Sequence, residues 1–159
     1  MDNQKQLREH LVQLLKGGQA HASIEDAVKG LPFELTGVKP THVPYSVWQL
    51  LEHIRIAQWD IVQFSHKADH VSPKWPDEFW PKNPKPESEK VWHDTLHKIQ
   101  KDRKQMIDSI SDSKQDLYTA FPYGDGQTLL REALLIVDHT SYHTGEIILV
   151  RRLLKAWDK

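Results

Sequence analysis

Ten histidines are the residues of this chain best suited to chemistry, because six of them form three pairs spaced four residues apart. On a helix, that spacing stacks two imidazoles on one face, so both ring nitrogens can reach the same ion. The pairs are His66 with His70, His93 with His97, and His139 with His143. Since the chain has no cysteine, any metal site must use nitrogen or oxygen ligands. Spacing alone does not identify which pair binds metal, so the residues around each pair must be considered.

The surroundings favour His139 and His143. These two follow the apolar run 133–137 within the most apolar segment of the chain, where an imidazole without a partner would be costly. The other two pairs have charged neighbours such as Lys67 and Asp94, typical of solvated helix faces. The pair at 139 and 143 is therefore predicted to supply two metal ligands.

His53 is the predicted third ligand. It lies in the middle of another predicted helix and is flanked by Leu50, Leu51 and Ile54, close to the core-facing edge. Helical bundles assemble metal sites from facing helices in this way. The alternative is that the three are core histidines bonded to their neighbours, or that His53 merely faces water. Residue spacing leaves both interpretations open.

Helical periodicity and capping residues predict the elements that must position these histidines. Helices are predicted over residues 4–16, 24–29, 46 to about 65–69, 87–110 and 128–156. Ser23 with Asp26 and Ser46 with Gln49 form possible capping boxes. The last helix carries apolar residues on several faces and is expected to be the central, most buried one. With no alternating strand pattern, the prediction is an all-α four-helix bundle forming one domain, 1–159.

Composition excludes several classes of protein. The 159 residues are 38% hydrophobic and 27% charged, with a net charge of −1 and a pI near 6.8, which does not suit a nucleic-acid binder. No apolar run is long enough to span a bilayer. The first ten residues are polar and lack the pattern of an export signal. A cytoplasmic protein without nucleic-acid or membrane partners is expected.

Two segments carry a family resemblance. Ser46-Val-Trp-Gln-Leu-Leu-Glu-His53 and His139-Thr-Ser-Tyr-His143-Thr-Gly-Glu-Ile resemble the signature segments of the DinB/YfiT-like superfamily. The connector that begins at Gly17 and the ending Arg151-Arg-Leu-Leu are similar to that family too. The resemblance implies a four-helix bundle with a long crossover between helices two and three, frequent homodimers, and a metal site on His53, His139 and His143.

Three neutral imidazoles leave a coordination position open, which is typical of catalytic sites. A metal ion there lowers the proton affinity of water or of a substrate thiol. Zinc and nickel are the first candidates, and iron and copper are compatible with the ligands. A metalloprotease is not expected, because no glutamate directly follows His139 to act as the general base of the protease motif.

Family members include transferases that join low-molecular-weight thiols such as bacillithiol or mycothiol to electrophiles, and a thiol-dependent isomerase. Others are regarded as metal-dependent hydrolases. The resemblance therefore favours a metal-dependent S-transferase or hydrolase acting on a small molecule, with a low-molecular-weight thiol as one candidate partner. The alternative is a non-enzymatic metal-binding or dimerisation module in a stress response.

Glu146 shares the face of His139 and His143, so it is a candidate to orient a histidine, to hold water or to act as a base. A solvated surface charge is the alternative. Tyr142 is a candidate hydrogen-bond donor to the site or a core tyrosine. Gly145 is expected to permit close contact with a neighbouring helix.

Residues 71–86 contain five of the nine prolines and form a predicted stiff loop. Trp75, Phe79 and Trp80 lie in this loop and are candidates to line a substrate pocket. The alternative is that these aromatic residues simply pin the loop to the bundle.

Overall fold

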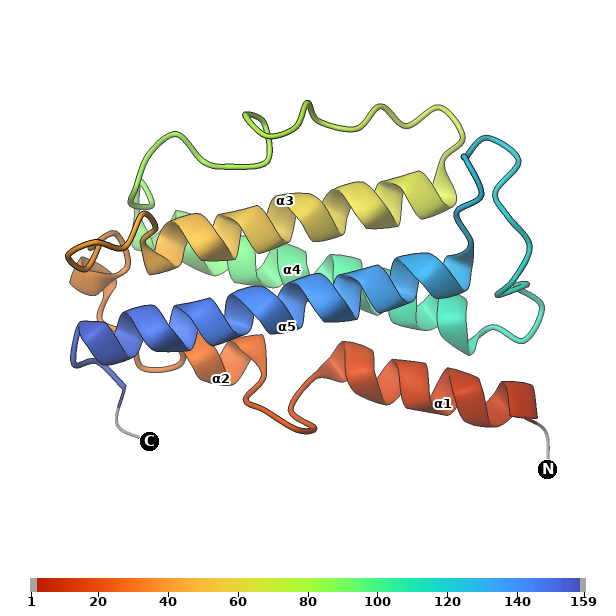
Figure 1. Ribbon diagram of the computed structural model, residues 1–159, viewed down its shortest axis with the longest axis horizontal. Coiled ribbons are helices and arrows are strands. Elements are labelled where there is room, and N and C mark those ends of the chain that lie inside the picture. Colours follow the sequence, from red (N-terminus) through yellow and green to blue (C-terminus); the bar gives the residue numbers. More distant parts are fainter. Residues whose placement is uncertain (1–2, 158–159) are drawn as a thin grey trace.

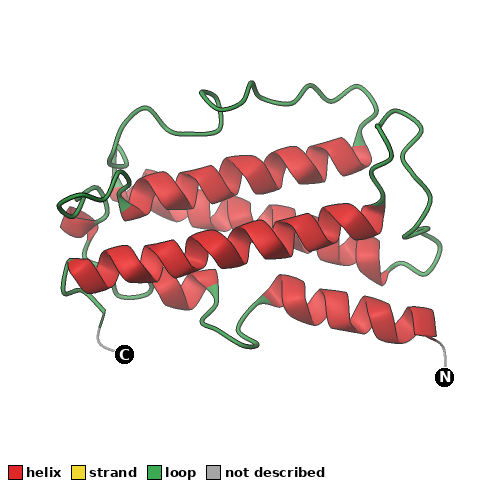
Figure 2. Cartoon of the chain, in the orientation of Figure 1, coloured by secondary structure: helices red, strands yellow, loops and turns green. Residues whose placement is uncertain are grey.

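The computed structural model describes residues 3–157 and shows an all-helical chain (Figure 2). The elements are α1 (Asn3–Lys16), α2 (Ile24–Val28), the 3-10 turn η1 (Phe33–Leu35), α3 (Val47–His66), α4 (Glu89–Ser111) and α5 (Leu129–Leu153). Within these residues, β pairing is limited to one isolated bridge between Ala120 and Thr128. The predicted all-α fold class is confirmed.

Four long helices lie along one another (Figure 1). Helix α3 packs against both α4 and α5, and α1 packs against α4 and α5 on the other side of the molecule. The short α2 lies beside α5. Helices α3 and α5 run in opposite directions, so the first half of α3 lies beside the second half of α5 (Figure 1). No helix within residues 3–157 combines the length and apolarity needed to cross a lipid bilayer.

The segment 67–88 returns along α3 from its C-terminal end to the start of α4 (Figure 1). It is fastened to α3 by three polar contacts. These are His70 Nε2 with Asp60 Oδ1 at 2.7 Å, His53 Nδ1 with the Phe79 carbonyl at 2.8 Å, and the Ser46 hydroxyl with the Pro84 carbonyl. Because of this crossover, α3 and α4 run in the same direction, and the loop covers the face of α3 that carries His53.

Side-chain caps account for where the helices begin. Ser46 accepts a hydrogen bond from the Gln49 amide while the Gln49 side chain accepts one from the Ser46 amide, so the predicted capping box is present. Ser23 accepts from the Asp26 amide as predicted. Ser88 caps α4, which therefore begins two residues later than the periodicity indicated.

The expectation that α5 is the most buried helix is wrong. Nine of the 20 residues of α3 are buried, against nine of the 25 residues of α5. Leu134, Leu149 and Leu153 of α5 are 46%, 54% and 52% exposed. Helix α5 carries apolar residues on several faces, but no described element covers its outer one. A Cβ built on Gly145 meets nothing within 4 Å, so the expected close helix contact there is absent from the described residues.

A buried arginine joins α1 to the end of α4. The guanidinium of Arg8 donates to the carbonyls of Ile110, Asp112 and Gln115 at 2.8, 3.0 and 2.6 Å. The last carbonyls of a helix have no partner within it, so Arg8 supplies a donor to Ile110 in the last turn of α4 as well as to the loop that follows. A second buried arginine, Arg151, donates in the same manner to the carbonyls of Ala27 and Lys29 at the end of α2.

Candidate metal centre

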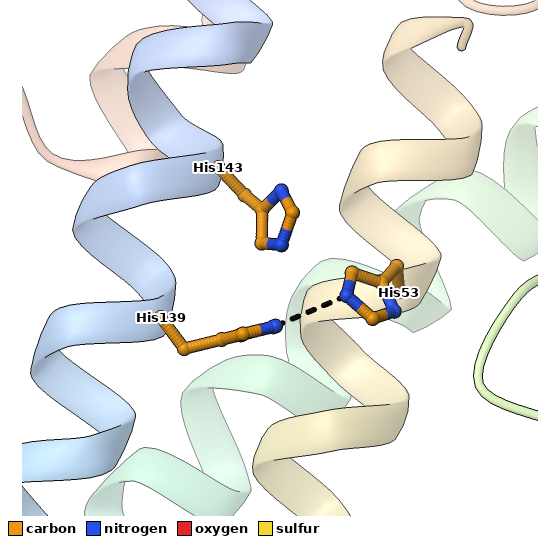
Figure 3. Close-up of side chains that lie close together, drawn as sticks. All are labelled: His53, His139 and His143. Carbon is orange, nitrogen blue, oxygen red and sulfur yellow. Dashed lines mark hydrogen bonds between the residues drawn. The ribbon is translucent and has the colours of Figure 1, made fainter. Parts of the chain in front are cut away.

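The bundle brings His53, His139 and His143 together (Figure 3). His53 lies two turns into α3, and the other two lie one turn apart on α5. One ligand nitrogen from each ring can be chosen so that all three lie within 4.8 Å of one another. Among residues 3–157, these three histidines form the one group of three or more histidine, aspartate or glutamate side chains close enough together to hold an ion. His53 and His143 are 2% and 8% exposed.

The spacing of these nitrogens is close to that of a metal site. Two nitrogens at about 2.0–2.1 Å from one tetrahedral ion lie about 3.3 Å apart. His53 Nε2 and His139 Nε2 are 3.0 Å apart, so this pair needs almost no adjustment. Nitrogens of the group lie up to 4.8 Å apart and would have to move closer together on binding an ion. The donor set therefore fits a divalent ion that prefers nitrogen ligands.

His53 is oriented by the crossover loop. Its Nδ1 lies 2.8 Å from the Phe79 carbonyl oxygen, which can only accept, so Nδ1 carries the proton and Nε2 keeps its lone pair. Trp80 stacks on the same ring at 3.9 Å between centroids and 5° between planes, and Tyr45 stacks on Trp80 in turn. The loop thus fixes both the tautomer and the plane of this imidazole.

His143 is oriented by Glu146. Its Nδ1 lies 2.6 Å from Glu146 Oε2, one turn further along α5, so the imidazole donates to the carboxylate. Its Nε2 then keeps its lone pair and faces His53 and His139 (Figure 3). A carboxylate behind a histidine is a common arrangement in metal sites, because it fixes the ring and increases its basicity. Among the roles predicted for Glu146, the structure favours orienting a histidine.

His139 differs from the other two. Because His53 has its proton on Nδ1, the 3.0 Å contact between the two Nε2 atoms requires His139 to donate from Nε2. Binding of an ion would require that proton to leave Nε2. The His53–His139 hydrogen bond is therefore the arrangement that a bound metal would replace.

Burial keeps two of the rings neutral. Burial lowers the pKa of His53, the bond to the Phe79 carbonyl opposes this, and repulsion from His143 adds to the lowering. Burial, with repulsion from His143 and His53, lowers the pKa of His139 to about 3. Neutral imidazoles are the forms that bind metal, so the site is prepared for an ion at ordinary pH.

The other histidine pairs have different partners. His66 contacts the Val62 carbonyl through Nδ1 and Ser109 through Nε2, and His70 pairs with Asp60. His93 and His97 are exposed on α4. Neither pair gains a third ligand within the described residues.

The predicted accessory residues have separate positions. Phe79 contributes its backbone carbonyl, and Trp80 packs on His53, so both hold the loop and the histidine. Trp75 is 70% exposed, with its ring 6.4 Å from that of His53. Tyr142 is 65% exposed and contacts His143 edge to face at 4.9 Å through its ring. A cleft of about 540 Å³ lies elsewhere, between α1 and the end of α4.

Comparison with known proteins gives one match. The sequence profile of the DinB superfamily matches residues 18–147, which include all three histidines, helices α2, α3 and α4, and α5 as far as Ile147. Comparisons with curated proteins and with solved structures gave no match.

Proposed function

The chain belongs to the DinB superfamily, and on that premise we propose that it is a metal-dependent S-transferase for a low-molecular-weight thiol. The ion, zinc or nickel first, is held by His53, His139 and His143. When bound there, it lowers the proton affinity of a substrate thiol at neutral pH. Homodimerisation, expected from the family resemblance, is part of the same proposal, and the mass of the metal-loaded protein in solution tests it.

One observation supports the metal site above all. Both His53 and His143 direct their Nδ1–H groups at oxygen acceptors, and both therefore keep the Nε2 lone pair for the space that they share with His139. Core histidines that only need partners have no reason to turn the same nitrogen of both rings toward one shared space, where His53 Nε2 also meets His139 Nε2 at 3.0 Å. Open coordination beyond three imidazoles is typical of catalytic sites.

The position of Glu146 favours thiol transfer over hydrolysis. A hydrolase benefits from a general base for water, and the carboxylate of Glu146 is already engaged by His143 Nδ1–H at 2.6 Å. Thiol activation needs no such base, because lowering the proton affinity of the thiol is sufficient.

A hydrolase is the second candidate. Only one oxygen of Glu146 accepts from His143, and the side chain is 29% exposed, so water can reach it. The Glu146→Gln variant separates the two. At saturating metal, a transferase keeps most of its rate, whereas a hydrolase that uses this carboxylate as a base loses about a hundredfold or more.

The test is a panel of low-molecular-weight thiols with one electrophile, followed by mass spectrometry of the adduct. We expect turnover by the metal-loaded wild type, none after chelation, and none by His143→Ala. His93→Ala is the matched control, because it removes an exposed histidine from α4. Equal adduct formation by wild type, His143→Ala and buffer would contradict the proposal.

A further inference from the structure

Two large aromatic side chains lie exposed beside the three histidines. Trp75 is 70% exposed and Tyr142 is 65% exposed. The ring centroids of Trp75 and His53 are 6.4 Å apart and those of Tyr142 and His143 are 4.9 Å apart, while the two histidine rings are 4.7 Å apart. Each aromatic side chain therefore lies beside one histidine of the cluster, one from the crossover loop and one from α5.

The fastening of the loop does not explain the position of Trp75. Trp80 stacks on His53, and the Phe79 carbonyl accepts from the same ring. These contacts hold the loop, while the Trp75 ring remains mostly in solvent. An indole buries on the order of 150–250 Å² when covered, so an exposed one offers a large apolar contact to a ligand.

The charge around the histidines restricts what such a ligand can be. Within residues 3–157, the hydrogen-bond contacts of His53 and His139 are with each other and with the Phe79 carbonyl, and none is with a charged side chain. The charged side chain in contact with the cluster is the carboxylate of Glu146, bonded to His143. A ligand with an anionic body would find no lysine or arginine paired to these rings, and would meet a carboxylate.

Resting on the proposed function, we propose that Trp75 and Tyr142 hold the body of the substrate, and that this body is a flat, uncharged aromatic group. The two rings contact its faces or edges while its reactive end reaches the space between the three histidines. Favourable aromatic contacts change affinity by about two- to tenfold each. Selection for the aromatic body therefore comes from side chains that do not bind the ion.

The test measures binding rather than turnover. Protein loaded with zinc and assayed for metal content is titrated calorimetrically with benzohydroxamate, acetohydroxamate and 4-carboxybenzohydroxamate, which share one metal-binding group. We expect benzohydroxamate to bind about tenfold more tightly than acetohydroxamate, and the added carboxylate to remove most of that gain.

Variants assign the gain to the two rings. Trp75→Ala and Tyr142→Ala should each reduce the preference for the aromatic probe, whereas Trp75→Phe should keep most of it. Tyr118→Ala is the control, because it removes a tyrosine that is 53% exposed elsewhere on the molecule, and it should leave the preference unchanged. Equal affinity for the aromatic and aliphatic probes, or a preference that survives both alanine variants, would overturn the inference while leaving the metal site intact. Absence of bound metal, with no binding of any probe, would overturn the proposed function and this inference together.

Discussion

Glu146 offers a sharp test of how the site is built. Its carboxylate accepts from His143 Nδ1–H at 2.6 Å, with 10% and 29% of the two side chains exposed. Glu146→Gln keeps an oxygen acceptor but removes the charge, whereas Glu146→Ala removes both. If the bond orients His143 for metal binding, both variants weaken metal affinity, and alanine weakens it more.

The expected size follows from the kind of bond. A hydrogen bond to a charged group contributes about 1.5–3 kcal/mol and a neutral one about 0.5–1.5 kcal/mol. Partial exposure of Glu146 favours the lower ends of both ranges. The glutamine variant then loses about 1 kcal/mol, or about fivefold in affinity, and the alanine variant about 1.5 kcal/mol, or about twelvefold. The alanine value lies at the lower end of the roughly tenfold to hundredfold typical of groups behind metal ligands.

The assay is competition for zinc against a chromophoric chelator at constant pH and salt. Asp138→Asn is the control, because it removes an exposed carboxylate next to His139 without touching the His143 bond. We expect this control to change affinity by less than the glutamine variant does. Equal weakening by Glu146→Gln and Asp138→Asn would show a long-range charge effect, and no weakening in Glu146→Ala would refute the orienting role.

Four further predictions concern stability, each followed by thermal or denaturant unfolding. Zinc at a hundred times its dissociation constant should add about 2.7 kcal/mol to the free energy of unfolding and raise Tm by roughly 5–10 °C. This rise in Tm should vanish on chelation and in His139→Ala. Arg8→Met leaves the Ile110 carbonyl in α4 and two carbonyls in the following loop without their charged donor, and should cost about 3 kcal/mol. Arg152→Met, at an exposed position, should cost under about 0.5 kcal/mol. Gly145→Ala should add about 1 kcal/mol, because the new Cβ meets nothing within 4 Å and alanine favours the helix; destabilisation would contradict an open face there. Burial raises the pKa of Asp102, so the folded state holds the carboxyl proton more tightly than the unfolded state does, and the contribution of this group to stability falls as pH rises through the raised pKa. Asp102→Asn should therefore gain stability relative to wild type as pH increases from about 4 to 7. A difference in stability that stays constant over this range would contradict the prediction.

Local sequence signals predicted the elements that position the site. Ser46 and Gln49 formed the capping box that starts α3, and Ser23 capped α2, because capping depends on residues within one turn. The apolar surroundings of His139 and the core-facing edge of His53 indicated that these rings would face each other. Periodicity contains that information, since it defines which face of a helix is buried.

Contacts between distant segments were beyond sequence reasoning. The Phe79 carbonyl that fixes His53 is a backbone group, and every residue has one, so no side-chain pattern marks it. The spacing of Glu146 placed it on the right face but did not determine its rotamer. Nothing in the sequence distinguished Trp80, which packs on His53, from Trp75, which remains exposed. The burial of α5 was overestimated because apolar content was taken as coverage, and its outer leucines are exposed.

The metal content of the protein tests the central claim most directly. Protein purified without a histidine tag, before and after reconstitution, is measured by elemental mass spectrometry beside His53→Ala, His139→Ala, His143→Ala and the control His93→Ala. We predict close to one transition-metal ion per chain in the wild type and the control, and loss of that ion in each of the three site variants. Absence of metal after reconstitution, or its retention when the three histidines are removed, would contradict the account and identify them as core residues bonded to one another.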